Sequence, residues 1–200
     1  MRMIRKILLL VAVLGVVQVV AAPLAAQRPP NRPTLWLGAG AGLGWARVTC
    51  QVCHPNRGHS LSASVHGGGR ISGHVLLGGE VQGWLKNSDP AQDRPADELM
   101  LAYSAVVYWY PSTRYSYYLK GGLGLVTYRI DDGTDRLTSS ALGPQIGAGW
   151  ELQLPSHFSV VPFFNVLVAS TGADLKFNGT EVLTDASLTL IQLGVGLARR

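Results

Sequence analysis

The stretch HSLSASVHGGGRISGHVLLGGEVQGWL, residues 59–85, decides the fold of this chain. In its first half, apolar side chains occupy the odd positions, including Leu61 and Val65, while serine and histidine occupy the even ones. After Ser72 and Gly73 the alternation resumes, with Val81 on one face and Glu80 on the other. Because successive residues of a β-strand point to opposite faces, this pattern predicts two strands joined by a tight turn. Each strand has one apolar and one polar face.

The same alternation recurs on both sides of this hairpin. It is present at residues 35–45, 99–109, 117–125 and 142–150, and two final strands are expected at about 158–169 and 188–198. The total of eight strands is even, as bacterial outer-membrane barrels require. Abundant glycine and valine disfavour helices, and no stretch after residue 26 approaches 18 uninterrupted apolar residues. A helical membrane protein is therefore excluded.

The expected connections alternate between short and long. Short ones are predicted around Ser72, at 111–116 and at 154–157, and long polar ones at 49–58, 86–98, 130–139 and 170–186. This alternation is typical of outer-membrane barrels. Apart from Glu80 and Glu151, every carboxylate lies in or beside three of the long connections. Because a lipid-facing charge costs about 2 to 4 kcal/mol at the bilayer midplane, we expect charges only in the lumen and the loops.

Aromatic residues are expected at the two edges of the apolar outer face. One group would surround the end with the short turns and consists of Trp109, Tyr117, Trp150 and Phe158, with Trp45 toward the other end. Such girdles mark the two interfaces of a membrane. Pro144 and Pro162 fall inside predicted strands, where each removes one hydrogen-bond donor from the ladder.

The glycine-rich strands at 37–44 (Leu-Gly-Ala-Gly-Ala-Gly-Leu-Gly) and 120–125 (Lys-Gly-Gly-Leu-Gly-Leu) complete a resemblance. Over about residues 34–200 the chain resembles the small outer-membrane barrels of the outer membrane protein A, X and W type and the porin-like β-barrel families. The resemblance implies an all-β fold, an eight-stranded antiparallel up-and-down transmembrane β-barrel. It also implies a monomer whose partners are outer-membrane lipid, lipopolysaccharide and, during biogenesis, the barrel-assembly machinery.

The first 26 residues differ from the rest of the chain. Three basic residues precede a 14-residue apolar run, 7–20, which is followed by small residues around Pro23. This order predicts a signal peptide at 1–26, a proline-rich segment at 27–33 and the barrel at 34–200, and it places the protein in the outer membrane after export. Removal of the signal peptide lowers the formal net charge from +5 to +2, so nucleic acid is not an expected partner.

Cys50, Cys53 and His54 match the C-x-x-C-H pattern of c-type haem attachment. A glycine-rich barrel supplies no helices to wrap a haem, and the motif falls in a long loop. We favour a local disulfide between Cys50 and Cys53, because exported paired cysteines oxidise. Zinc bound by these three residues and His59 is a further alternative, although the spacing is not that of a zinc finger. We expect no cofactor.

The polar residues on the predicted inward face form the second candidate site: His66, Arg70, Glu80, Gln82, Lys120, Gln145 and Glu151. The lumen of an eight-stranded barrel is just wide enough to be filled by side chains. Buried charges persist only when they are paired and hydrogen-bonded. We therefore favour a structural salt-bridge network over a conducting pore.

An enzyme on the same barrel is the main alternative function. His157 and Ser159 have the spacing that a lipid A deacylase uses, but they are predicted at a short turn, away from the outer leaflet. The acidic loop at 131–135 lacks the alternating oxygens of an EF-hand. We therefore expect a non-catalytic barrel with a structural, surface-interaction or minor-conduit role. The alternatives are a lipid-modifying enzyme, an exported haem- or metal-binding protein, and a soluble lipocalin-like barrel with its apolar face inward.

Overall fold

The computed structural model describes residues 35–49, 57–86, 97–112, 116–131, 135–155, 157–183 and 186–199. Every regular element in these ranges is a β-strand. Eight long strands make the main body: β1 (Leu35–Thr49), β2 (Arg57–Arg70), β3 (Val75–Lys86), β4 (Asp97–Trp109), β5 (Tyr117–Asp131), β6 (Arg136–Trp150), β8 (Phe158–Ala169) and β11 (Ser187–Arg199). Three shorter strands accompany them: β7 (Leu152–Gln153), β9 (Thr171–Phe177) and β10 (Thr180–Leu183).

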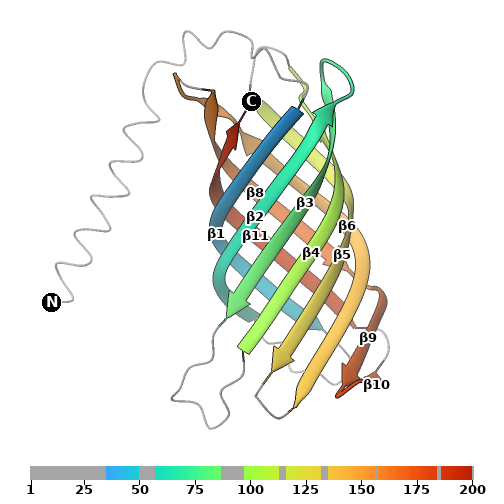
Figure 1. Cartoon of the computed structure of the whole chain (residues 1–200). Helices are drawn as coiled ribbons and strands as arrows, with labels where there is room; N and C mark the ends of the chain where they lie inside the picture. Colours follow the sequence, from blue (N-terminus) through green and yellow to red (C-terminus); the bar gives the residue numbers. More distant parts are fainter. Residues whose placement is uncertain are drawn as a thin grey trace, which may run out of the picture.

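The eight long strands form a closed antiparallel barrel (Figure 1). Consecutive strands pair from β1 to β6, β6 pairs with β8, β8 with β11, and β11 returns to β1. We call the end that carries residues 71–74, 110–116 and 151–157 the short-turn end, and the opposite end the long-loop end. The predicted fold class is confirmed, and the tight turn lies where it was expected, with Ile71 N donating to Val75 O at 3.0 Å.

The strands alternate between an exposed apolar face and a buried face. Leu61 is 66% exposed, Leu123 60% and Ile146 62%, although all three are large apolar residues in regular strands. Their neighbours along each strand point into the barrel and are buried or nearly so. The apolar face is therefore the outside of the barrel, which contradicts the lipocalin-like alternative. The aromatic residues of the expected girdles are also on this exposed face.

Pro144 and Pro162 both lie on the exposed face of the barrel wall. At Pro144 strand β6 changes partner, because Gln145 to Gly149 pair with β8 whereas the segment from Leu142 to Leu137 pairs with β9. A residue without an N–H is tolerated at such an interruption of the ladder. Pro162 is accommodated within the β8–β11 ladder opposite Val195.

The connection predicted as a loop at 170–186 contains a β-hairpin instead. Strand β9 continues along β6, and β10 folds back on β9 at the long-loop end (Figure 1). Asn178 and Gly179 between them have φ values of 48° and 86°. Positive φ at both central residues is the mark of a type I′ turn, for which Asn-Gly is a preferred pair. The turn chemistry of these two residues, rather than any alternation, explains the additional strands.

Bulky side chains fill the lumen in two apolar clusters. The short-turn cluster contains Trp36, Leu76, Val106, Tyr108, Tyr110, Tyr118, Val161 and Ala198. The long-loop cluster includes Trp84, Met100, Tyr128, Leu167 and Leu188. The glycine-rich inner face of β1 makes this possible, since a Cβ on Gly44 would lie 2.6 Å from the Trp84 ring. The glycines of this inner face leave room for large residues from other strands.

Candidate functional site

A belt of buried polar side chains crosses the lumen between the two apolar clusters. We call it the polar belt, and its members are Ser62, Ser64, His66, Glu80, Gln82, Ser104, Lys120, Gln145, Asn165 and Gln192. Strand pairing aligns them, because His66 lies opposite Glu80, and Glu80 lies opposite Ser104. Directly paired residues of antiparallel strands share a face, so all of these side chains point into the lumen.

Glu80 is the centre of the polar belt. Its carboxylate forms an ion pair with Lys120, whose Nζ donates to Oε2. Gln145 Nε2 donates to the same oxygen at 3.1 Å, and Asn165 Nδ2 donates to Oε1 at 3.4 Å. The two charged side chains are 1% and 3% exposed, so water screens this interaction very little. The arrangement satisfies a buried charge pair with neutral donors from two further strands, which is what burial of such a pair requires.

His66 joins the polar belt to the short-turn cluster. Its ring stacks on Trp36 with a centroid distance of 4.4 Å and an interplanar angle of 24°. Trp36 meets the edge of Tyr108, whose hydroxyl group donates to Glu80 at 3.5 Å. A Cβ on Gly38 would lie 2.2 Å from His66 Nε2, so this position accepts the ring only because it is glycine. Stacking and close backbone approach together hold His66 in one place.

Five of the seven predicted lumen residues belong to the polar belt: His66, Glu80, Gln82, Lys120 and Gln145. Glu151 is also buried, but it lies at the short-turn end, where it accepts a 2.7 Å hydrogen bond from Tyr110. Arg70 does not join either group. It is exposed at the last position of β2, opposite Leu76, and His66 rather than Arg70 lies opposite Glu80.

Besides the three belt serines, three residues that hydrogen-bond to Glu80 or to its partner Asn165 were missed from the sequence: Asn165, Gln192 and Tyr108. Asn165 Nδ2 is within 3.3 Å of Gln192 Oε1, which connects β8 and β11 to Glu80. Asn165 and Gln192 alternate along their strands with exposed apolar neighbours such as Phe164 and Leu193. Assigning faces to the last two strands would have found them, because the same period of two identifies the inward positions there.

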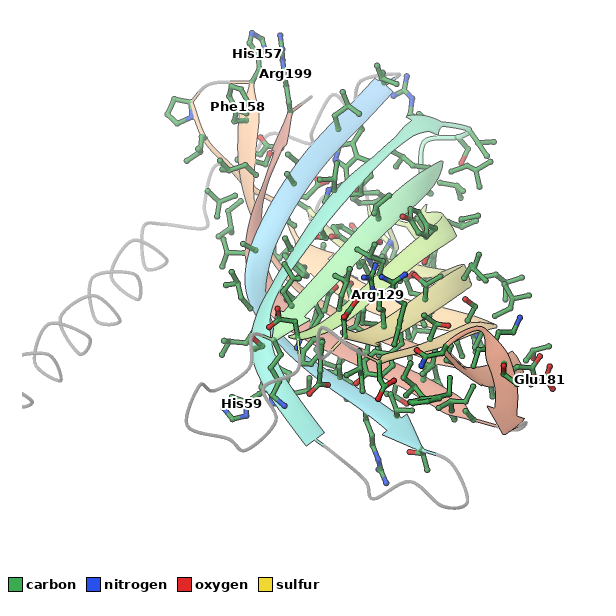
Figure 2. All side chains as sticks on the ribbon, turned by 60° about the horizontal axis from the view of Figure 1, so that its bottom comes forward. His59, Arg129, His157, Phe158, Glu181 and Arg199 are labelled. Atoms are coloured by element: carbon green, nitrogen blue, oxygen red, sulfur yellow. The ribbon has the colours of Figure 1, made fainter. Side chains whose placement is uncertain are left out.

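The structure supports none of the alternative chemical sites within its described ranges. His157 is exposed at the short-turn end, whereas Ser159 is buried inside the barrel, so the two side chains do not form a pair on one face (Figure 2). Cys50, Cys53 and His54 lie outside the described residues, as does the predicted signal peptide. No group of three or more potential metal ligands occurs in the described part of the chain. The described part of the chain has only strands, so it contains no helix that is long and apolar enough to cross a membrane.

Charged residues gather again at the long-loop end. Inside the mouth, Lys86 pairs with Glu98 at 2.8 Å, and Tyr128 donates to the same carboxylate at 2.6 Å. On the outer wall, Asp131 accepts hydrogen bonds from Arg129 and, at 3.3 Å, from Arg136. Figure 2 shows His59 and Glu181 toward this end, opposite His157 and Phe158. At the long-loop end, the exposed polar groups thus lie beyond the edge of the apolar outer face.

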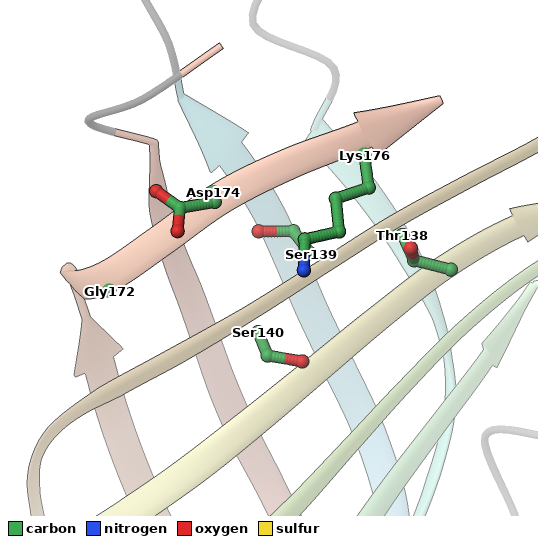
Figure 3. A pocket seen from close by; sticks show the side chains of 6 residues that line it. All are labelled: Thr138, Ser139, Ser140, Gly172, Asp174 and Lys176. Atoms are coloured by element: carbon green, nitrogen blue, oxygen red, sulfur yellow. The ribbon is translucent and has the colours of Figure 1, made fainter. Parts of the chain in front are cut away.

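A small pocket opens in the wall between β6 and β9 near this end (Figure 3). Its volume is about 90 Å³, and it is lined by Thr138, Ser139, Ser140, Gly172, Asp174 and Lys176. The pocket lies at a β-bulge, because the register shifts between Ser140 and Leu142 and Gly172 has a φ of 72°. A glycine with positive φ is the hallmark of one common class of bulge.

Comparisons with known structures agree with this architecture. Neisserial surface protein A matches with a TM-score of 0.56 and 14% identity, over 84% of this chain and 97% of that chain. The attachment invasion locus protein Ail of Yersinia pestis, solved with the heparin analogue sucrose octasulfate, matches with a TM-score of 0.50 and 12% identity, over 83% of this chain and 99% of that chain. No protein-family model matches the sequence. No curated protein matches it either.

Proposed function

We propose that this chain is a non-catalytic, non-conducting barrel of the bacterial outer membrane that acts through its long-loop end. The single observation behind the proposal is that apolar side chains cover the outer face of the barrel, whereas charged side chains are kept away from it. The exposed face is apolar over the middle of every long strand, and the charged groups of the described residues lie either inside the barrel or beyond the apolar face. Only a surrounding lipid phase makes an apolar outside favourable on a closed barrel.

The filled lumen supports the non-conducting part of the proposal. The polar belt is covered by the short-turn cluster on one side and by the long-loop cluster on the other. Trp84 and Met100 are fully buried on one side, and Tyr108 and Tyr118 are 1% and 2% exposed on the other. The lumen of an eight-stranded barrel is just wide enough for side chains to fill it, so burial of these large residues argues against a hydrated ion path.

The position of the accessible polar groups supports a role for the long-loop end. The polar belt is enclosed, so its charges are out of reach of a substrate and serve packing and registration of the strands. Asp131, Arg129 and Arg136 lie instead on the outside of the long-loop end, at the edge of the apolar face. A fold does not imply a function, so specificity is assigned to this surface and its loops rather than to the barrel.

The test combines location, folding and conductance. Cells expressing the full chain are fractionated, and the envelope fraction is run on SDS gels with and without boiling. We expect heat-modifiable migration in the outer-membrane fraction. Purified protein in planar bilayers should give no current steps above the background of empty bilayers. A soluble periplasmic product would refute the membrane location, and reproducible ion currents from the folded form would refute the closed lumen.

A further inference from the structure

The outer wall over β5, β6 and β9 changes from apolar to polar within three rows of residues. Strand register defines these rows. From the middle of the barrel toward the long-loop end they are Leu125, Leu142 and Thr171, then Thr127, Ser140 and Asp174, then Arg129, Thr138 and Lys176. Leu125 is 45% exposed and Leu142 is 44% exposed, so the first row still belongs to the apolar face. The next two rows therefore lie at the level where lipid headgroups begin.

The bulge in β9 turns these two polar rows into a concave site. Two residues of β9, Gly172 and Ala173, occupy the space that one residue of β6 spans, so the strands separate locally. Gly172 contributes no side chain and nothing lies within 4 Å of where its Cβ would be. The result is the pocket of about 90 Å³ between β6 and β9, and its lining residues Ser140 and Lys176 are exposed on the outer face of the wall. Bulges of this kind often occur beside functional sites.

The pocket combines one cation, one anion and three residues with a hydroxyl group. Lys176 and Asp174 line it from β9, and Thr138, Ser139 and Ser140 line it from β6 (Figure 3). Among the described residues, Lys176 makes no ion pair. Arg129, whose side chain is 45% exposed, lies next to Thr138 in the same row. A second cation is therefore adjacent to the pocket, and two carboxylates lie near the two cations, because Arg129 also donates to Asp131 and Glu181 lies opposite Lys176.

These groups match a ligand that carries both a phosphate and hydrogen-bond donors. Lys176, the remaining N–H groups of Arg129 and the hydroxyl groups of the pocket can donate to phosphate oxygens, as cations and hydroxyl groups commonly do. Asp174 only accepts hydrogen bonds, so a bare phosphate leaves it unmatched, whereas the hydroxyl or amide groups of a sugar would donate to it. A metal ion is disfavoured by the ammonium group in the same pocket.

We infer that this pocket binds the phosphorylated sugar headgroup of an outer-leaflet glycolipid. The inference rests on the proposed membrane location and names a partner for the long-loop end. The acyl chains of the lipid would lie along the apolar face below, against Leu125 and Leu142, while the headgroup occupies the bulge. The pocket then fixes the orientation of one lipid relative to the barrel.

The experiment measures lipid binding to the folded full chain in detergent micelles by native mass spectrometry. The probe is lipid A with both phosphates, compared with enzymatically dephosphorylated lipid A, phosphatidylglycerol and soluble glucosamine phosphate. We expect lipid A to bind about tenfold or more tightly than any of the other three. About tenfold is the gain in affinity expected from one additional charge-assisted contact. Tight binding of soluble glucosamine phosphate would show a free sugar phosphate as the ligand and overturn the lipid assignment.

Variants locate the site. Lys176→Gln should weaken lipid A binding about tenfold, and Ser140→Leu, which fills the pocket without changing its charge, should weaken it similarly. Arg199→Gln is the control, because Arg199 is an exposed cation at the short-turn end. Heat-modifiable migration of each variant shows that the barrel is folded. Two outcomes, each obtained with a folded outer-membrane barrel, would overturn this inference and leave the proposed function intact. One is equal binding of phosphorylated and dephosphorylated lipid. The other is an equal loss of binding in all three variants.

Discussion

Replacement of Lys120 by methionine should strongly destabilise the barrel. The substitution keeps most of the side-chain volume but leaves the Glu80 carboxylate buried without its cation. Gln145 and Asn165 would still donate to it at 3.1 and 3.4 Å, but neither residue carries a charge. The expected loss therefore comes from the missing opposite charge rather than from a cavity.

The magnitude follows from the burial of the pair. The two side chains are 3% and 1% exposed, so solvent screening is weak. Two unit charges about 4 Å apart interact by about 4 kcal/mol at an effective dielectric constant of about 20. Measured losses on removal of one partner from buried pairs are about 3 to 5 kcal/mol. We expect Lys120→Met to lower the free energy of unfolding by a similar amount.

The assay is equilibrium unfolding in guanidinium chloride from lipid vesicles, followed by tryptophan fluorescence and by heat-modifiable migration. Glu80→Gln alone should cost a comparable amount, because it leaves the ammonium group of Lys120 buried. The double variant with Glu80→Gln and Lys120→Met removes both charges and should be more stable than either single variant. Single losses below about 1 kcal/mol, or losses that simply add in the double variant, would refute the buried ion pair.

Three further predictions test the packing and the orientation of the wall. Trp84→Ala should lower the free energy of unfolding by about 3 to 5 kcal/mol, because it empties the long-loop cluster, whereas Trp109→Leu on the outer face should cost far less in the same guanidinium titration. Gly38→Ala should cost about 1 to 3 kcal/mol by displacing His66, and adding His66→Ala should recover part of that loss; no recovery would show that the contact is not the cause. Leu123→Arg should reduce stability in lipid vesicles by about 2 to 4 kcal/mol, and an unchanged unfolding midpoint would contradict a lipid-facing wall.

The strand positions and their faces follow directly from the sequence. Alternation along residues 59–85 predicts β2, β3 and the turn between them, because the period of two is a local property of an extended backbone. The same reasoning assigns Glu80, Lys120 and Gln145 to the lumen, and the structure buries all three. It failed at Arg70, since alternation gives the direction of a side chain but not its height in the barrel.

The hairpin β9–β10 shows a second limit of pattern reasoning. Its signal is the Asn178-Gly179 pair, which favours a type I′ turn. The bulge at Gly172 could not be predicted in the same way. A bulge depends on how two strands pair. Strand β9 pairs with β6 beyond the segment of β6 that pairs with β8, and no local pattern in the sequence gives that partner.

The sequence by itself determined that this chain forms strands, which face of each is apolar, and that polar side chains point into a lumen. Those properties depend on residue type and on the spacing of neighbours along one chain. Only the tertiary structure decided that Glu80 pairs with Lys120, 40 residues away, and that Trp84 fills the space above Gly44. Such contacts depend on stagger between strands and on closure of the barrel, which bring together side chains that no local pattern connects.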